Sequence, residues 1–106
     1  MGRLHRWADG VWLVLQDVRW EVGNQLHQWG IQHHPDGTGG QWDASLADYA
    51  KVVCGAKAKA GTLTWKDILL EEVYEACAES DRQRLRAELV QVAAVCVSWI
   101  EDIDNG

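Results

Sequence analysis

The stretch Glu88-Leu-Val-Gln91-Val-Ala-Ala-Val-Cys-Val97 decides the fold of this chain of 106 residues. It contains neither proline nor glycine, and after Glu88 almost every side chain is apolar. A helix that is apolar nearly all round is normally buried. We therefore expect a helix that packs inside an all-α protein, with the carboxylate of Glu88 at the edge of its apolar face.

The rest of the chain predicts three further helices and no strand, so the expected architecture is a four-helix bundle. Apolar residues recur at helical spacings of three or four, and no alternating strand pattern is present. Gly30 and Gly61 are helix-ending signals, whereas Thr64 and either Ser80 or Asp81 are helix-starting signals. The predicted helices cover residues 8–29, residues 43–59 (opened near Asp43), Thr64 to about Glu79, and Arg82 to about Asp102.

Length and charge limit the classes of function. A chain of this length predicts one domain over residues 1–106. Its core is modest, so we expect a second subunit to complete it, in a homo-oligomer that is a dimer or a tetramer. The net charge of −6 argues against binding to a nucleic-acid polymer. The apolar run at residues 11–15 is too short to span a bilayer, and we expect a cytoplasmic protein with no membrane partner.

Five acidic residues share one broad side of the third predicted helix. They are Asp67, Glu71, Glu72, Glu75 and Glu79. A solvated helix face is the ordinary interpretation of such a pattern. No basic residue lies between the first and the last of them, however, so no ion pair within the helix relieves their repulsion.

Glu88 strengthens the case for a bound cation. An unpaired charge at the head of a buried helix costs several kcal/mol or more. A buried salt bridge to an arginine is the alternative, but Arg82, Arg84 and Arg86 are expected to project elsewhere. Carboxylates on two facing helices can offer several oxygens to Mg²⁺, which keeps water positions for substrate phosphates. We therefore predict a divalent-metal site between the third and fourth helices.

A glycine-rich loop at residues 30–42 supplies further candidates. His34 and Asp36 lie in its His-Pro-Asp-Gly-Thr turn, where imidazole and backbone N–H groups can meet phosphate. A plain surface turn is the alternative. A Zn²⁺ site is not expected, because the adjacent histidines, His33 and His34, diverge in an extended loop and no cysteine pair accompanies them.

Three more residues are candidates for binding a small phosphorylated ligand. Lys57 and Arg86 flank the starts of the third and fourth helices and could contact phosphate oxygens. Trp29 borders the loop and could stack on a base. Solvated surface positions are the alternative for the two basic residues.

The acidic clusters resemble the signature of the all-α nucleoside triphosphate pyrophosphohydrolases, the superfamily of MazG-like proteins and dimeric dUTPases. That signature is EExxE, a spacer and ExxD on consecutive helices. Here it reads Glu71-Glu72-Val-Tyr-Glu75, twelve residues, and Glu88-Leu-Val-Gln91. Two other stretches resemble short MazG-like proteins of bacteriophages and bacteria. They are Trp29-Gly-x-Gln-x-His-Pro-Asp-Gly-Thr38 and Thr64-Trp-x-x-Ile-Leu-x-Glu-Glu72. The resemblance extends over roughly residues 17–104.

The resemblance implies hydrolysis of a nucleoside triphosphate to a monophosphate and pyrophosphate, with Mg²⁺ or Mn²⁺ as cofactor. Glu71 and Glu72 are the implied catalytic residues, Glu71 as a further ligand or as a base that orients water. The implied metal ligands are Glu72, Glu75, Glu88 and Gln91.

Gln91 departs from the family pattern, which has Asp at this position. Its amide oxygen can bind Mg²⁺, but one negative charge is lost and the site is weakened. Glu71 or Asp67 could compensate. A protein that binds nucleotides without turnover is therefore the second hypothesis, and a small helical interaction module with a solvated acidic surface is the third.

Overall fold

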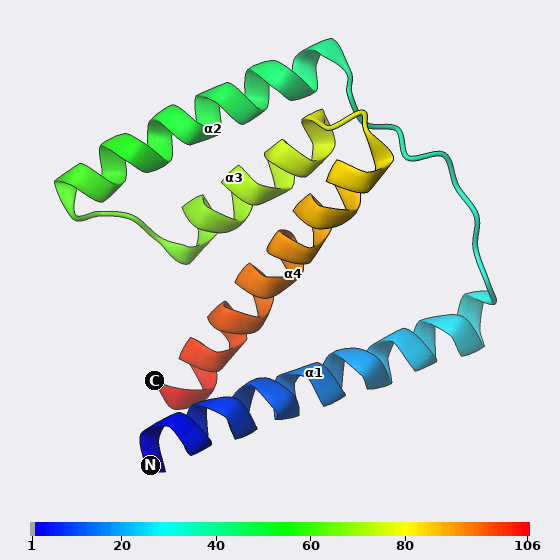
Figure 1. Cartoon of the computed structure of the whole chain (residues 1–106), viewed down its shortest axis with the longest axis vertical. Coiled ribbons are helices and arrows are strands. Elements are labelled where there is room, and N and C mark those ends of the chain that lie inside the picture. Colours follow the sequence, from blue (N-terminus) through cyan, green and yellow to red (C-terminus); the bar gives the residue numbers. More distant parts are fainter. Residues whose placement is uncertain (1) are drawn as a thin grey trace. The chain divides into compact units, whose positions relative to one another are not determined.

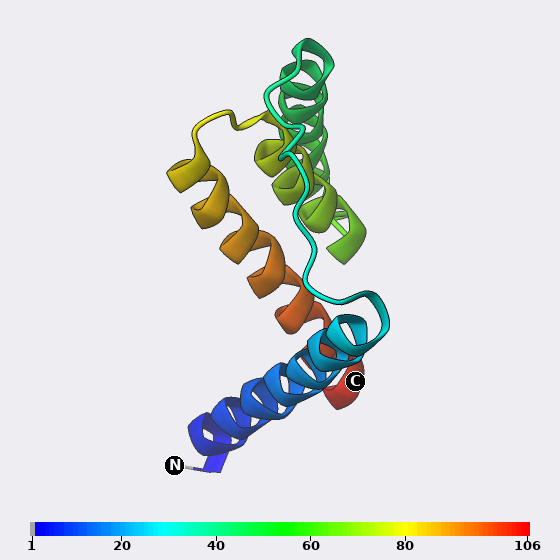
Figure 2. The same ribbon diagram turned by 90° about the vertical axis from the view of Figure 1, so that its right-hand side faces the viewer.

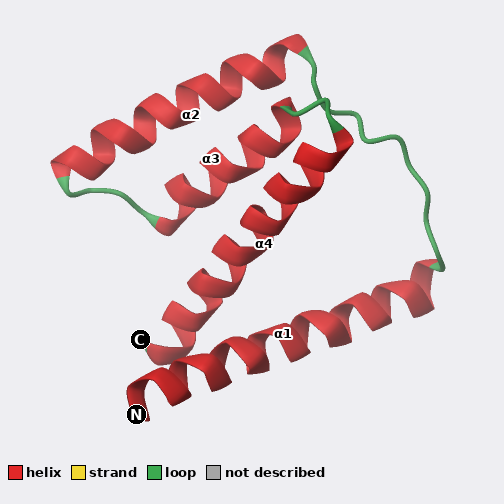
Figure 3. Cartoon of the chain, in the orientation of Figure 1, coloured by secondary structure: helices red, strands yellow, loops and turns green. Residues whose placement is uncertain are grey.

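The computed structural model describes the chain from Gly2 to Gly106, with side chains from Gly10 onward. Over these residues it contains four α-helices and no strand (Figures 1 and 3). The helices are α1 (Gly2–Trp29), α2 (Gln41–Ala60), α3 (Trp65–Ala78) and α4 (Arg82–Asn105). The all-α class is thus confirmed. Packing into a four-helix bundle and the single domain over residues 1–106 stay predictions.

Glycines end α1 and α2 as predicted. Gly30 follows α1, and its N–H donates to the carbonyl of Leu26 at 2.8 Å. Gly61 follows α2 with a φ of 73°, a left-handed conformation that favours glycine over residues with a Cβ. The start of α1 differs from the prediction, because the helix begins at Gly2 instead of residue 8.

Capping interactions set the starts of α2 and α3. Gly40 is the N-cap of α2, and its N–H donates to the carboxylate of Asp43 at 3.0 Å. Asp43 is therefore the third helical residue, and the predicted opening near it lies slightly too late. In α3 the predicted N-cap is confirmed, because the hydroxyl of Thr64 accepts the N–H of Asp67 at 3.2 Å. The Asp67 carboxylate in turn accepts the N–H of Thr64, which completes a capping box.

Asp81 determines where α4 begins. Its carboxylate accepts the N–H of Arg84 at 2.9 Å, so Asp81 is the side chain that caps the helix, not Ser80. The helix starts at Arg82 as predicted and continues to Asn105, beyond the expected end at Asp102.

The chain forms two compact units, and each is described by itself. The terminal unit comprises Met1–Pro35 with Val97–Gly106, and the central unit comprises Asp36–Cys96. In the terminal unit Val14 is almost fully buried, and the buried Glu101 carboxylate occupies the space where a side chain at Gly10 would lie.

The central unit positions the candidate site. In it α2 and α3 lie side by side, as both views of the ribbon show (Figures 1 and 2). Ala50 and Cys54 of α2 and Ala76 of α3 are buried, as is Leu85 of α4. The three cysteines are free thiols, and only Cys54 among them is buried.

The middle of α4 is less buried than its composition predicts. Leu89 is 52% exposed and Val90 is 55% exposed, and Gln91 is exposed as well. Val92 and Cys96 are half-buried. The expectation that residues 89–97 are buried all round is therefore wrong for the single chain, because only one side of this helix is covered.

A similar apolar stripe is exposed along α1. The side chains that repeat at the helical period remain between 43% and 63% exposed. They are Leu15, Val18, Val22, Leu26 and Trp29. No helix in the described part of the chain is long and apolar enough to cross a membrane.

Candidate metal centre

Three glutamates from α3 and α4 meet in the central unit. One carboxylate oxygen each of Glu72, Glu75 and Glu88 lies within 4.8 Å of the other two. Glu72 and Glu75 are three residues apart, so α3 places them on one face. Glu88 approaches that face from α4, which follows α3 after a short turn (Figure 1). We call these residues the glutamate triad. All three are half-buried.

Two oxygens of the triad are buried without a partner. Oε2 of Glu72 and Oε2 of Glu88 are inaccessible to solvent and accept no hydrogen bond. Leaving a buried acceptor unsatisfied costs about 1–3 kcal/mol, and more when the group is charged. Arg84 lies one turn before Glu88, yet within the described residues no ion pair links a basic side chain to the triad. The predicted salt-bridge alternative is therefore absent there.

Burial and mutual repulsion disfavour the ionised triad. Burial is the largest cause that raises the pKa of Glu72, and the charges of Glu75 and Glu88 raise it further. Burial likewise raises the pKa of Glu75, followed by the charge of Glu88. A hard divalent cation would offset this repulsion and satisfy the buried oxygens. The residues present therefore fit such an ion.

Sequence reasoning did not identify Lys51 of α2, whose charge acts on the triad. This charge lowers the pKa of Glu75 and so partly opposes the effect of burial. Lys51 is exposed near the middle of α2. Nothing in the sequence indicates this proximity, because it depends on the register between α2 and α3.

The remaining acids of α3 contact α2, although the charge of Glu71 also raises the pKa of Glu72 and Glu75. Glu71 lies against Cys54, where burial raises the thiol pKa to about 11 and the Glu71 carboxylate contributes to the shift. Asp67 accepts two hydrogen bonds from Nζ of Lys57, at 3.0 and 3.1 Å. The broad acidic side of α3 is therefore not one solvated face, since its members contact two different helices.

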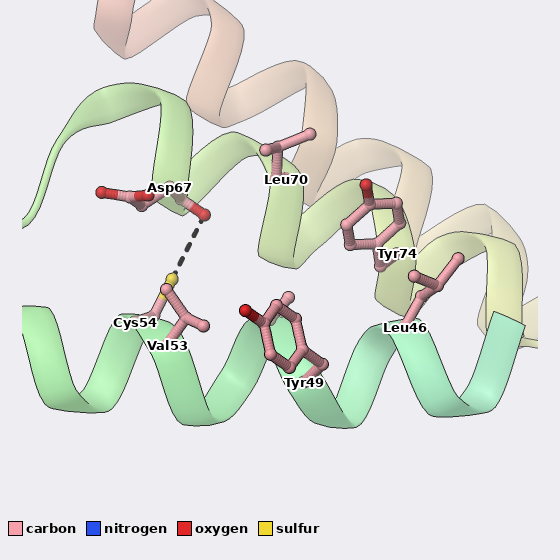
Figure 4. A pocket seen from close by; sticks show the side chains of 8 residues that line it. Leu46, Tyr49, Val53, Cys54, Asp67, Leu70 and Tyr74 are labelled. Carbon is pink, nitrogen blue, oxygen red and sulfur yellow. Dashed lines mark hydrogen bonds between the residues drawn. The ribbon is translucent and has the colours of Figure 1, made fainter.

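A small apolar cavity separates α2 from α3 beside these acids. Its volume is about 190 Å³. Figure 4 shows Tyr49 and Tyr74 on opposite sides of it, and the Sγ of Cys54 donating to the backbone carbonyl of Asp67 at 3.2 Å. The remaining lining residues are Leu46, Ala50, Val53 and Leu70.

Two residues predicted to bind substrate are occupied by ion pairs. Lys57 pairs with Asp67, as described above. Oδ2 of Asp36 lies 2.9 Å from Nε of Arg82, so this carboxylate holds the first residue of α4. Either side chain would have to leave its partner before it could contact a phosphate.

The other predicted residues lie on exposed surfaces. Arg86 is exposed on α4, turned about 200° around the helix from Glu88. Gln91 is exposed one turn after Glu88. In the terminal unit, Nε2 of His34 lies 2.8 Å from Oε1 of Gln32 on an exposed segment. Trp29, the last residue of α1, is 63% exposed.

Comparisons of the chain with models of protein families, with curated proteins and with solved structures find no match. The described residues form four α-helices, with a half-buried glutamate triad on α3 and α4.

Proposed function

We propose that this protein is a Mg²⁺-dependent nucleoside triphosphate pyrophosphohydrolase that resembles the MazG-like proteins in fold. One observation carries the proposal. Two carboxylate oxygens of the glutamate triad are buried without partners. The triad lies on consecutive helices, where the sequence reads Glu71-Glu72-x-x-Glu75 on the first and Glu88 on the second. A divalent cation would satisfy these oxygens, and carboxylate oxygens are what Mg²⁺ and Mn²⁺ bind.

The residues of the site have different roles in the proposed hydrolysis. Glu72, Glu75 and Glu88 would hold the metal ion, with the amide oxygen of Gln91 as a neutral fourth donor. The bound ion would supply positive charge that neutralises triphosphate oxygens and makes a water molecule more acidic. Glu71, next to the triad in sequence, accepts a proton from the attacking water. Water adds across the anhydride between the α and β phosphates and yields the monophosphate and pyrophosphate.

The substrate is a small nucleotide held at the surface of the triad. Arg86 has no ion-pair partner among the described residues, but it points away from Glu88 around α4, so it is a weaker candidate for a phosphate oxygen at the triad. Lys57 and Asp36 of the same unit would contact the substrate only after leaving their present ion pairs. His34 and Trp29 belong to the terminal unit, and their roles in phosphate binding and base stacking stay predictions from the sequence.

Self-association belongs to the same proposal. The exposed apolar stripe of α1 supports a homo-oligomer, a dimer or a tetramer, because single chains seldom leave so many large apolar side chains in water.

A nucleotide-binding protein without turnover is the second candidate. Asp67 favours this candidate. Its carboxylate is bound to Lys57 and Thr64, so it does not supply the negative charge that the site loses by having Gln91 in place of an aspartate. The two candidates share the metal and differ only in product formation.

Pyrophosphate release from a panel of NTPs and dNTPs, with Mg²⁺ or Mn²⁺, tests the proposal. Glu72→Gln and Glu75→Gln should each abolish release, whereas Glu21→Gln, on the exposed surface of α1, should not. Full activity in either triad variant would remove these residues from the site. Nucleotide binding without product would select the second candidate.

A further inference from the structure

The loop segment Asp36–Gly40 runs along the turn that joins α3 to α4. The hydroxyl of Thr38 donates to the backbone carbonyl of Glu79, the C-cap of α3, at 2.6 Å. The N–H of Gly39 donates to the carbonyl of Cys77 at 2.8 Å. The two views of the ribbon agree that this loop passes beside the turn (Figures 1 and 2).

The same segment also contacts the start of α4. Asp36 accepts from the guanidinium of Arg82, with Nε to Oδ2 at 2.9 Å. Gly39 comes so close to Ser80 that a Cβ at this position would lie 2.9 Å from the Ser80 Cβ. Its φ of 82° is left-handed, so glycine is required there on two grounds.

These contacts connect the loop to both helices of the glutamate triad. Thr38 holds the end of α3 one turn after Glu75, and Asp36 holds the beginning of α4 before Glu88. Glu88 lies about 9 Å along α4 from Arg82, so pivoting α4 by about 10° at the turn would shift Glu88 by about 1.6 Å. Metal–ligand distances tolerate changes of only about 0.2 Å.

We propose that Asp36, Thr38 and Gly39 are positioning residues, which hold α3 and α4 at the angle where Glu88 meets Glu72 and Glu75. The inference rests on the proposed function, because it takes the triad to be a metal site. It assigns to the loop a role other than the phosphate contact that its histidines and glycines predict. The half-buried Thr38 bond contributes more than the Asp36–Arg82 pair, since exposed ion pairs are weak.

Mn²⁺ binding to the full chain, followed by electron paramagnetic resonance, tests the proposal. Thr38→Val removes the hydroxyl with little change of shape, and it should weaken Mn²⁺ binding about fivefold, the change that one lost hydrogen bond produces. Thr38→Ser retains the hydroxyl and should restore the affinity and the spectrum. Thr62→Val is the matched control, because its hydroxyl makes only a long, exposed bond to the carbonyl of Lys57.

The exposed pair provides variants that do not depend on the buried bond. Asp36→Asn and Arg82→Gln should each weaken Mn²⁺ binding by less than Thr38→Val, with helix content unchanged in circular dichroism. Wild-type affinity in all three variants, while Glu72→Gln abolishes binding, would overturn the positioning role and leave the metal site intact. Absence of Mn²⁺ binding by the wild-type chain would overturn the metal site and the positioning role together.

Discussion

Nζ of Lys57 lies 3.0 Å from Oδ2 of Asp67, and this ion pair joins the last turn of α2 to the first turn of α3. The same carboxylate accepts the N–H and the hydroxyl of Thr64. Hydrogen bonds from Thr64 and then from Lys57 lower the pKa of Asp67 to about 2. The ion pair between Asp67 and Lys57 therefore stabilises the packing of the end of α2 against the start of α3.

The first prediction concerns stability at low pH. Because the pKa of Asp67 is depressed in the folded state, its contribution to stability is complete above the ordinary value of 3.8 and is lost as the pH falls toward 2. Lys57→Met should lower the thermal midpoint at pH 7, and the acid-induced loss of stability should begin at a higher pH than in the wild type. Lys59→Met removes the same charge from the same turn without a carboxylate partner. Thermal unfolding from pH 2 to pH 7 should therefore leave Lys59→Met like the wild type, and equal effects of the two variants would contradict the role of the pair.

The glutamate triad predicts the opposite dependence on pH. Burial and repulsion raise the pKa of Glu72 and Glu75, so protonation favours the folded state. This stability is present below the unfolded pKa of 4.5 and is lost as the pH rises through the folded pKa. Glu72→Gln should therefore stabilise the metal-free protein at pH 7 and have little effect at pH 4.

Added metal should make the wild type more stable than Glu72→Gln at pH 7, the reverse of the order without metal. Millimolar Mg²⁺ should raise the thermal midpoint of the wild type at pH 7, because it binds only the folded state, and should leave Glu72→Gln unchanged. An equal rise in both proteins would show that the metal binds elsewhere.

The third prediction compares two glycines. Gly39→Ala should lower the free energy of unfolding by about 1–2 kcal/mol, the cost of a left-handed L-residue, with the contact at Ser80 adding to it. Gly23→Ala should instead raise it by about 0.5–1 kcal/mol, since Gly23 lies inside α1 and a Cβ there has no neighbour within 4 Å. Chemical denaturation measures both, and the same sign for the two variants would contradict the close approach at Gly39.

Local signals predicted much of the fold. The N-cap at Thr64 and the glycines that end α1 and α2 act within one turn of the chain, so residue type alone indicates them. The apolar spacing in α1 begins later than the helix itself, so it does not indicate where α1 starts.

The candidate site was predicted only in part. The spacing predicted that glutamates from two consecutive helices meet, but not that Glu71 turns toward Cys54 while Glu72 joins Glu75 and Glu88. Adjacent helical residues point about 100° apart, and only the rotation of α3 between its neighbours decides which of them enters the triad. The pairing of Asp36 with Arg82 joins distant parts of the sequence, and local pattern gives no sign of it.

The exposed stripe of α1 predicts a change in oligomeric state. Val22 is 50% exposed within the stripe, so Val22→Glu should place a charge in the proposed subunit contact and dissociate the oligomer. Gln16→Glu adds the same charge on another side of α1 and should not. Sedimentation velocity distinguishes the outcomes. A wild-type chain that sediments as a monomer at micromolar concentration would contradict self-association.

Gln91→Asp tests whether the missing charge limits the site. Gln91 lies one turn after Glu88, and an aspartate there adds a fourth carboxylate near the cation. We expect Mn²⁺ affinity to rise about tenfold, which corresponds to about 1.4 kcal/mol, and pyrophosphate release to rise with it. Gln91→Asn keeps the amide but shortens the side chain, so it separates length from charge. Gln83→Glu adds a charge at another exposed position of α4 and controls for net charge. If Gln91→Asp and Gln83→Glu raise the affinity equally, long-range attraction explains the gain and Gln91 is not a ligand.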